Sequence, residues 1–364
     1  MQRVSIIIPN CNHAPFLERR IRSVLEQTVG HCEVIFLDDA STDNSRAVYE
    51  KFAGRLRQPS RSGLSEADRS GTERPRPESV DLLVRSVFND TNSGSPFRQW
   101  NKGVQLARGE YVWIAESDDV ADGQFLERLV PLLDRHPKVG LACCASKLID
   151  GAGDVIGETA DWWKLLHPTR WRADFVNDGK DECARYLIHK NTIPNASAVL
   201  FRKSIYERAG GADETMRFCG DWMIWAKMLM LSDVAYVAEP LNFWRKHPET
   251  VTARLAHSGL HLAEQMQVVA TIVGQADVPL EQRREAVDYL MKKWAKLVLN
   301  RGWRQPMRTH RRLYQIARQI DPMLPARVAR RVLRHHLDTK PALAPLRPVA
   351  RASARAARWV RGKG

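Results

Sequence analysis

Three carboxylates stand within four positions directly after a strongly apolar run. Residues 111–115 are rich in β-branched and aromatic side chains, which predicts a buried strand, and Glu116, Asp118 and Asp119 follow it. Clustered carboxylates repel one another unless a cation lies between them, and oxygen ligands suit Mg²⁺ or Mn²⁺. The pattern indicates a divalent-metal site at the carboxyl end of a strand, where open α/β sheets bind ligands. Taken alone, the turn also fits a solvated acidic loop.

A second pair of acids, Asp38 and Asp39, follows residues 33–37, which form another predicted buried strand. The carboxyl ends of parallel strands meet at one edge of a sheet, so the two acidic groups are expected to face the same ligand. Such an edge suits a nucleoside diphosphate, with one carboxylate accepting from a base N–H and the other acids holding a metal on the phosphates. A simpler role also fits, in which Asp38 or Asp39 caps the helix predicted from Ser41.

Strands and helices alternate over the first part of the chain. Apolar runs predict strands at residues 4–9, 33–37, 82–88, 111–115 and 139–145. Apolar residues at three-to-four spacing predict helices at 15–28, 41–52, 97–107 and 123–136. This alternation is typical of an α/β fold with a mostly parallel sheet flanked by helices. Farther on, we predict a hairpin at 147–156, helices at 181–189, 203–209 and from 221, and strands at 195–202 and 234–237.

The chain has 364 residues, 44% of them apolar, which is enough for a substantial core. The sequence shows neither an apolar run of membrane-spanning length nor a signal-peptide pattern at its N-terminus. Six cysteines without metal-type spacing are expected to be reduced core thiols in a cytoplasmic protein.

The net charge of +14 is concentrated near the C-terminus. Residues 301–364 carry 17 Lys and Arg against two acids, whereas residues 1–300 carry 39 basic and 40 acidic side chains. We therefore predict a main domain over 1–250, with a disordered insertion at 54–79 that is almost free of apolar residues. An α-helical extension is predicted over 251–340, amphipathic and basic from 301, followed by a basic disordered tail at 341–364.

Arginines alternate with aliphatic residues from Arg311 to Leu337, and Pro322 and Pro325 divide this segment into two short amphipathic helices. Our hypothesis is that residues 301–364 lie on an anionic membrane surface, where each basic residue contributes about 1 kcal/mol. Two alternatives stay open. The helices can form a solvated cap with a loose end, or the arginines can contact nucleic-acid phosphates without sequence preference.

Four blocks of sequence occur in a characteristic order over residues 3–250. They are Val4–Pro9 with Asn12, Ser23–Thr28, Leu37–Asp43, and Gly109–Tyr111 leading to Asp118 and Asp119. Together they resemble family-two inverting nucleotide-sugar glycosyltransferases of the bacterial polysaccharide and O-antigen type, which have the Rossmann-like GT-A fold. The chain departs from the family pattern at Cys11, where an aromatic residue is frequent, and in the length of the insertion at 54–79.

The resemblance implies a nucleotide pocket at the ends of the first two strands. Asp39 would contact the nucleobase with Asp38 beside it, and Pro9 and Asn12 would line the pocket. Lys102 falls in the segment that usually faces the diphosphate. The turn there is one residue longer than the usual pattern, so either Lys102 or Arg98 is the residue that reaches phosphate.

The resemblance also implies a metal site. Asp118 and Asp119 match the family's metal motif, with Asp119 as the direct ligand of Mg²⁺ or Mn²⁺ and Asp118 also near the donor. Glu116 occupies the first acidic position of that motif, where Asp is commoner. His247 belongs to an Arg-x-His pattern that in many relatives returns a histidine to the metal or the diphosphate, although an ordinary surface or core histidine is the commoner case.

Asp221 follows Gly210 and Gly211 at the start of a predicted helix. In the family such an acid is the catalytic base, which takes the proton from the acceptor hydroxyl as that oxygen attacks the anomeric carbon. A positioned base contributes about 10²–10⁴-fold to the rate. The alternative is that Asp221 is the N-cap of its helix.

These features favour a metal-dependent inverting hexosyltransferase. Its donor would be a nucleoside-diphosphate sugar, and its acceptor a saccharide or lipid-linked saccharide of a cell-surface polysaccharide or lipopolysaccharide. The enzyme would be cytoplasmic and peripheral on the inner face of the cell membrane, with no specific nucleic-acid partner. One alternative is a nucleotidyltransferase, although residues 9–13 lack the Gly-rich basic loop expected there. Another is a non-catalytic membrane- or nucleic-acid-binding adaptor with a degenerate sugar-nucleotide fold.

Overall fold

The computed structural model describes residues 3–30, 32–57, 83–246, 259–300 and 305–339. The chain divides into two compact units, described separately below. The first comprises Met1–Arg254 with Gln275–Asp277, and the second comprises Leu255–Gly274 with Val278–Gly364. Most of the predicted insertion, the tail at 341–364 and His247 lie outside the described residues.

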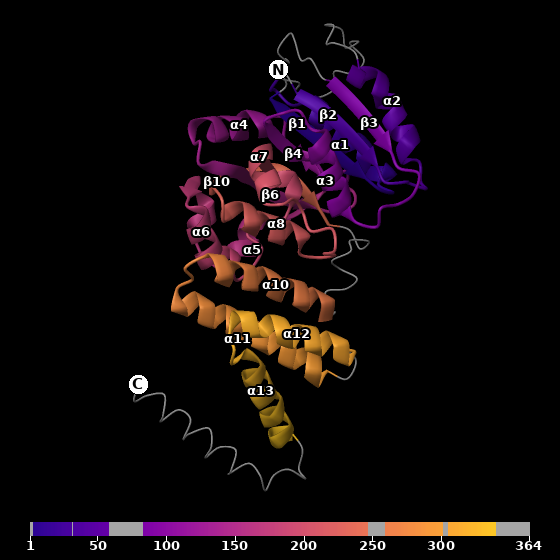
Figure 1. Cartoon of the computed structure of the whole chain (residues 1–364). Coiled ribbons are helices and arrows are strands. Elements are labelled where there is room, and N and C mark those ends of the chain that lie inside the picture. The colour runs from indigo at the N-terminus through magenta and orange to yellow at the C-terminus, as the bar shows by residue number, and fades with distance from the viewer. Residues whose placement is uncertain (1–2, 31, 58–82, 247–258, 301–304, 340–364) are drawn as a thin grey trace. The chain divides into compact units, whose positions relative to one another are not determined.

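The first unit is built on one mixed sheet with the strand order β3-β2-β1-β4-β9-β6-β10-β5 (Figure 1). Four neighbouring strands are parallel: β1 (Val4–Asn10), β2 (Cys32–Asp38), β3 (Leu83–Phe88) and β4 (Tyr111–Ile114). The strand β9 (Val199–Arg202) runs antiparallel between β4 and β6 (Val139–Ile149), and β10 (Asp233–Arg245) is parallel to β6. Three short strands pair antiparallel with these. β5 (Val120–Ala121) and β8 (Phe175–Asn177) both pair with β10, and β7 (Val155–Glu158) pairs with β6.

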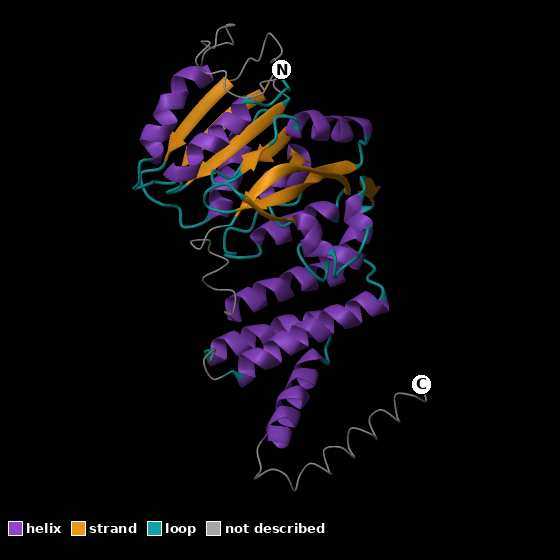
Figure 2. Cartoon of the chain, turned by 180° about the vertical axis from the view of Figure 1, so that it is seen from behind, coloured by secondary structure: helices purple, strands orange, loops and turns teal. Residues whose placement is uncertain are grey.

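The central strands are buried along their whole length. Every residue of β1, β2 and β4 is buried, as expected for parallel strands covered on both faces by helices. The flanking helices are α1 (Ala14–Leu25), α2 (Ser45–Arg57), α3 (Pro96–Leu106) and α4 (Phe125–Arg135), and they surround the sheet in Figure 2. This arrangement confirms the predicted α/β fold with flanking helices. All six cysteines are free thiols, and five of them are buried.

The middle of the chain is more irregular than its apolar pattern predicts. It contains α5 (Thr159–Trp163), α6 (Gly179–Glu182), a π-helical turn (Cys183–Leu187), α7 (Lys203–Arg208) and α8 (Gly220–Leu229). The strand predicted at 195–202 begins as a 3₁₀ turn (Ala196–Ala198) and becomes extended only at Val199.

Two predicted boundaries were wrong. The last strand was predicted to end at Val237, but β10 continues to Arg245. Its pairing with β6 shifts register around Pro240, so irregular pairing accommodates a proline that interrupts the apolar pattern. The insertion was predicted to begin at Gly54, but α2 continues to Arg57, so its first four residues are helical.

The second unit is helical, as predicted. Its helices are α10 (Gly259–Gln275), α11 (Leu280–Leu299), α12 (Met307–Ile320) and α13 (Leu324–Thr339), and α13 packs against both α11 and α12. Most aliphatic residues of α12 and α13 face inward, with Leu313, Ile320 and Leu324 fully buried and Leu333 exposed. The break between the two helices falls at Pro322, as expected. Among the described residues, no helix combines the length and the apolarity needed to cross a membrane.

A glycine brings α3 close to the sheet. A Cβ atom placed on Gly103 would lie 2.5 Å from Ile7 Cγ2, and Ile7 is fully buried in β1. We expect Gly103→Ala to lower the free energy of unfolding by about 1–3 kcal/mol, because neither the branched methyl group nor the strand can move freely.

Gly274 is a matched control, since it also lies in a helix but has open space where its Cβ would be. Gly274→Ala should leave stability unchanged or raise it by up to about 1 kcal/mol. Chemical denaturation of both variants measures the difference, and a fully stable Gly103→Ala variant would contradict the close packing of α3.

Candidate active site

Asp38 organises the loop that follows β2. Its Oδ2 accepts hydrogen bonds from Asn10 Nδ2 at 2.9 Å and from the Ser41 hydroxyl at 2.7 Å, and its Oδ1 accepts from the Ser41 N–H at 2.9 Å. Ala40, inside this loop, has a φ of 57°, a left-handed conformation that these bonds help to hold. The helix α2 begins only at Ser45, whose N–H donates to Asp43. The bonds of Asp38 therefore shape the loop rather than cap α2.

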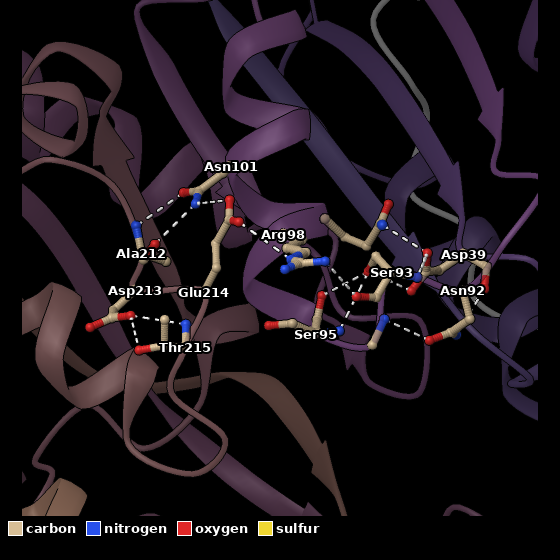
Figure 3. A network of polar contacts seen from close by, with 12 residues as sticks. Asp39, Asn92, Ser93, Ser95, Arg98, Asn101, Ala212, Asp213, Glu214 and Thr215 are labelled. Carbon is tan, nitrogen blue, oxygen red and sulfur yellow. Dashed lines mark hydrogen bonds and ion pairs between the residues drawn. The ribbon is translucent and has the colours of Figure 1, made fainter.

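Asp39 is 4% exposed and accepts hydrogen bonds through both carboxylate oxygens. Asn89 Nδ2 donates to Oδ1 at 2.6 Å, and Gln99 Nε2 from α3 donates to the same oxygen at 2.9 Å. Ser93 donates its N–H to Oδ1 and its hydroxyl to Oδ2, both at 2.8 Å (Figure 3). Asp39 is thus held in one orientation by the loop before α3.

The other predicted nucleotide-binding residues converge on the same loops. Asn12 has a φ of 57°, and its Oδ1 accepts from the backbone N–H groups of Thr42 and Asp43 at 2.7 and 3.2 Å. Lys102 Nζ donates to Oδ1 of Asn89 at 2.6 Å, and that asparagine also holds Asp39. Pro9 is buried in β1 opposite Leu37. Their contact with a nucleotide stays a prediction.

Asp119 is 1% exposed and joins three distant parts of the chain. Its Oδ1 accepts from the backbone N–H of Arg245 at 2.8 Å, and its Oδ2 accepts from Asn195 Nδ2 at 2.8 Å. Asp118 is half-buried, and Glu116 Oε1 accepts from Trp100 Nε1 of α3 at 2.6 Å. The acidic turn is therefore fixed by α3, by the end of β10 and by the segment before β9.

The charges of this turn are partly compensated by two buried arginines. Arg20 Nε donates to the carbonyl oxygen of Glu116 at 2.8 Å, and Arg245 Nε donates to the carbonyl oxygen of Asp118 at 2.7 Å. Burial lowers the pKa of Arg20 to about 10, although the three nearby acids oppose this effect. Among the described residues, Arg20 Nη1 and Nη2 and Arg245 Nη2 have no hydrogen-bond partner. When all three acids are ionised, they exceed the two arginines by one negative charge.

Burial and the neighbouring Asp118 raise the pKa of Glu116 to about 8 and also raise the pKa of Asp119. These shifts show that the three carboxyl groups lie close enough to repel one another when ionised. Oxygen donors in an excess of negative charge fit a hard divalent cation such as Mg²⁺ or Mn²⁺. The donor set therefore suits the predicted metal, with His247 outside the described residues.

Asp221 lies in the first turn of α8 and is half-buried. Its Oδ2 accepts from Asn191 Nδ2 at 2.9 Å, and its Oδ1 accepts from the N–H of Trp222 at 2.7 Å. The N-cap of α8 is Cys219, so the alternative in which Asp221 caps the helix is wrong. The carboxylate is instead oriented by a side chain from another segment.

Two sets of contacts bring Asp39, Asp119 and Asp221 to one region of the first unit. Asn191 holds Asp221 and Asn195 holds Asp119, so one five-residue segment touches both acids. Figure 3 shows the second connection, which runs from Asp39 through the loop before α3 to the turn before α8. The connection begins where the Ser93 hydroxyl donates to Asp39. Arg98 then contacts the Ser93 carbonyl oxygen and forms an ion pair with Glu214. Asn101 donates to Glu214 and to the carbonyl oxygen of Ala212.

A model described as glycosyl transferase family 2 matches residues 5–208 of the chain, which is more than half of it. The chain belongs to glycosyltransferase family 2. An uncharacterised glycosyltransferase from Nostoc is 25% identical over 252 residues, which cover 67% of this chain. The match covers 65% of that relative, slightly less than two thirds of its length.

Two solved glycosyltransferases share the fold. Residues 1–349 of S. aureus TarS, in complex with UDP-GlcNAc, give a TM-score of 0.62 at 15% identity and cover 98% of this chain and 92% of that one. The mannosyltransferase PcManGT from Pyrobaculum calidifontis, in complex with GDP-Man and Mn²⁺, gives a TM-score of 0.53 at 17% identity. The match covers 91% of this chain and 87% of the mannosyltransferase chain. The GT-A fold predicted for this family-two chain is confirmed.

Several residues of this family-two site were missed by the sequence reasoning. The most important are Arg20, Trp100, Asn191, Asn195 and Arg245, which contact the acids or their backbone. Arg20 carried a weak signal, because a charged residue next to the buried Ile21 interrupts an apolar helix face. The two asparagines carried no signal, since their roles depend on contacts across roughly 30 and 76 positions.

The pKa of Glu116 predicts a pH dependence of stability in metal-free protein. The folded-state pKa of about 8 lies above the ordinary value of 4.5, so the folded state favours the protonated form. The contribution of Glu116 to the free energy of unfolding should be fully present below pH 4.5 and should fall as the pH rises toward 8, by at most about 1.4 kcal/mol per pH unit.

Denaturation in EDTA from pH 5.5 to 8.5 measures this slope. Glu116→Gln should flatten the profile between pH 6 and 8, and Mn²⁺ should restore stability to the wild type at pH 8. An identical slope in the variant and the wild type would show that Glu116 is ionised throughout this range.

Proposed function

We propose that this protein is a metal-dependent, inverting glycosyltransferase that moves a sugar from a nucleoside-diphosphate sugar to the hydroxyl of a saccharide acceptor. The observation that carries the proposal is the segment 191–195, which holds Asp221 at one end and Asp119 at the other. Four Cα–Cα steps span at most about 14 Å, so one bound donor and acceptor can reach both carboxylates.

Donor binding is assigned to the ends of β1 and β2. Asp39 would accept a base N–H, since its Oδ2 accepts one hydrogen bond, from Ser93, and keeps a further lone pair. Pro9, Asn12 and Asp38 would shape the pocket, and Lys102 would face the diphosphate. The complexes of TarS with UDP-GlcNAc and of PcManGT with GDP-Man support a nucleotide sugar as the donor class.

Asp118 and Asp119 are proposed to hold Mg²⁺ or Mn²⁺, with His247 as a further ligand. Among the described residues, no three His, Cys, Asp or Glu side chains form a metal-binding group. Mg²⁺ is commonly bound by one or two carboxylates together with substrate phosphates, so two aspartates suit this role. The Mn²⁺ in the PcManGT complex supports the choice of ion. When bound, the cation neutralises charge on the departing diphosphate.

Asp221 is proposed as the general base. Its carboxylate takes the proton of the acceptor hydroxyl while that oxygen forms a bond to the anomeric carbon. The bond from the anomeric carbon to the diphosphate breaks on the opposite face, so the nucleoside diphosphate leaves and the configuration inverts. The hydrogen bond from Asn191 to Oδ2 fixes the orientation of the carboxylate.

The physiological context we propose is the synthesis of a cell-surface polysaccharide or lipopolysaccharide on a lipid-linked acceptor. Its support is the surface of α12 and α13, where seven arginines are exposed: Arg308, Arg311, Arg312, Arg318, Arg330, Arg331 and Arg334. Apolar side chains are exposed on the same helices, including Tyr314 at 47% and Leu333 at 58%. A basic surface with apolar side chains suits an anionic membrane.

The roles of the acids predict different defects in two variants. Asp221→Asn should lower the rate of nucleoside-diphosphate release from the donor by about 10²–10⁴-fold and leave donor binding unchanged, because only the base is lost. Asp118→Asn should abolish the Mn²⁺-dependent part of the donor's thermal shift. Asp118 is preferable to Asp119 for this test, since an asparagine at 119 would turn an amide N–H toward Asn195 or the Arg245 N–H.

A thermal-shift screen with UDP-, GDP- and dTDP-sugars, with and without Mn²⁺, selects the donor for both measurements. Absence of any stabilisation of the wild type by these donors would refute the proposed function. Normal turnover by Asp221→Asn would remove this residue as the base and leave the donor assignment intact.

Membrane binding is tested by neutralising Arg330, Arg331 and Arg334 on α13 with glutamine in the full chain. At about 1 kcal/mol for each basic residue, the variant should partition roughly 100-fold less onto vesicles that contain anionic lipid. Flotation on phosphatidylcholine vesicles with and without phosphatidylglycerol measures this change.

The matched control replaces three exposed arginines of the first unit, Arg46, Arg135 and Arg185, with glutamine. It removes the same charge from another surface and should float like the wild type. Equal flotation of all three proteins, or a wild type that does not float, would remove the membrane hypothesis.

A further inference from the structure

Two tryptophans and two lysines form a cluster beside the acids. Trp162 of α5 is 39% exposed and meets Trp244 of β10 edge-on, with ring centroids 6.0 Å apart. Lys190 Nζ lies 4.0 Å from the Trp162 ring centroid. Lys246 Nζ lies 2.8 Å from the Trp244 centroid and 5.7 Å from that of Trp162. We call these four residues the aromatic–lysine cluster, and nothing in the donor assignment uses them.

The backbone connects this cluster to both ends of the catalytic region. Lys190 immediately precedes Asn191, whose side chain holds Asp221. Lys246 immediately follows Arg245, whose N–H holds Asp119. Adjacent Cα atoms are about 3.8 Å apart, so each lysine is one residue from a direct contact to an acid. Each lysine is therefore one residue along the chain from a group that contacts the proposed base or the proposed metal ligand, and this proximity is the basis for placing an acceptor at the cluster.

The lysine ammonium groups have little compensation from the protein. Lys190 Nζ donates to the carbonyl oxygen of Trp162 at 2.7 Å, and within the described residues no carboxylate pairs with it or with Lys246. The nearby Asp161 forms an ion pair with Lys164 instead. Burial lowers the pKa of Lys190 to about 8. Two partly buried ammonium groups, neither in a direct ion pair with a described carboxylate, are suited to an anion supplied by a ligand, although Asp118 and Asp119 already favour the charged form of Lys246.

The aromatic rings add a second recognition element. An exposed indole ring presents a flat apolar surface, which suits the C–H face of a sugar ring. Cations held over aromatic faces are stabilised while they keep N–H groups free to donate elsewhere. An aromatic surface with two ammonium groups at its border matches a sugar that carries a negative group.

On the basis of the proposed function, we propose that the aromatic–lysine cluster is an acceptor subsite for an anionic saccharide. The acceptor sugar lies against Trp162, and its phosphate or carboxylate group binds Lys190 and Lys246. This arrangement turns a hydroxyl of the same sugar toward Asp221. The inference names the acceptor's chemical class, which the family assignment leaves open.

Three sugars serve as probes in the presence of Mn²⁺: glucose, glucose 6-phosphate and glucuronate. Saturation-transfer NMR titrations of the full chain should show that both anionic sugars bind at least about tenfold more tightly than glucose. The double variant Lys190→Met with Lys246→Met should remove this preference and leave glucose binding intact. Trp162→Ala should weaken the binding of all three sugars. Because the Trp162 ring is partly exposed, we do not expect this variant to have a folding defect.

Lys164→Met is the matched control, because it removes an exposed lysine two positions from Trp162 but outside the cluster. It should keep the preference for anionic sugars. Equal or undetectable binding of anionic and neutral sugars by the wild type would overturn the subsite.

The thermal shift with the selected nucleotide sugar separates this proposal from the proposed function. If the wild type and the double variant are stabilised equally by the donor, the lysines act on the acceptor side, as proposed. If the double variant loses donor stabilisation, the lysines bind the donor and the acceptor subsite is refuted. If the wild type itself gains no stability from any donor, the proposed function fails, whatever the sugars show.

Discussion

Helix α3 lies against β1 closely enough to fix three parts of the site from neighbouring positions. Gly103 allows this approach, because a side chain there would meet the buried strand. Gln99 donates to the acid after β2, Trp100 donates to the first acid after β4, and Asn101 holds the turn before α8. Successive residues of a helix point in different directions, so one helix can reach all three. A rotation or shift of α3 would misplace the nucleotide edge, the acidic turn and the base together.

The acidic turn shows how a fold can bury carboxylates and still leave them available to a cation. Arg20 and Arg245 supply positive charge, but each donates its Nε to a backbone carbonyl and not to a carboxylate. The arginines therefore lower the electrostatic cost of the turn without occupying the carboxylate lone pairs. Direct pairing with Asp118 or Glu116 would have formed strong bidentate contacts that a metal must break. Burial and the neighbouring Asp118 raise the pKa of Glu116, and a divalent cation beside these acids would favour their ionised forms.

The sequence predicted the parts of this protein that depend on local pattern. The alternation of apolar runs and helical stripes was sufficient for β1 to β4 and their helices, because parallel buried strands are uniformly apolar. The same pattern did not predict the full length of β10. Pro240 interrupts the apolar residues there, and the strand continues past it through irregular pairing with β6. Asp38, Asp39, Asp118 and Asp119 were predicted from their positions after strands, and Asp221 from the family resemblance. Their partners Asn191 and Asn195 were not, since an asparagine in a loop has the same local pattern whether it holds a distant acid or a turn.

This division between local and distant determinants separates the two halves of the site. The proposed donor side consists of the loops after β1, β2 and β4, so its geometry follows directly from the parallel sheet. The proposed acceptor side is assembled from α5, from the segment before β9 and from the end of β10, which are far apart in the sequence. Side chains such as Trp162 and Lys190 are partly exposed there, and their replacement changes surface chemistry more than packing. Because Asn191 and the Arg245 N–H tie these segments to the acids, the surface can change its acceptor while the position of the reacting groups is conserved by hydrogen bonds.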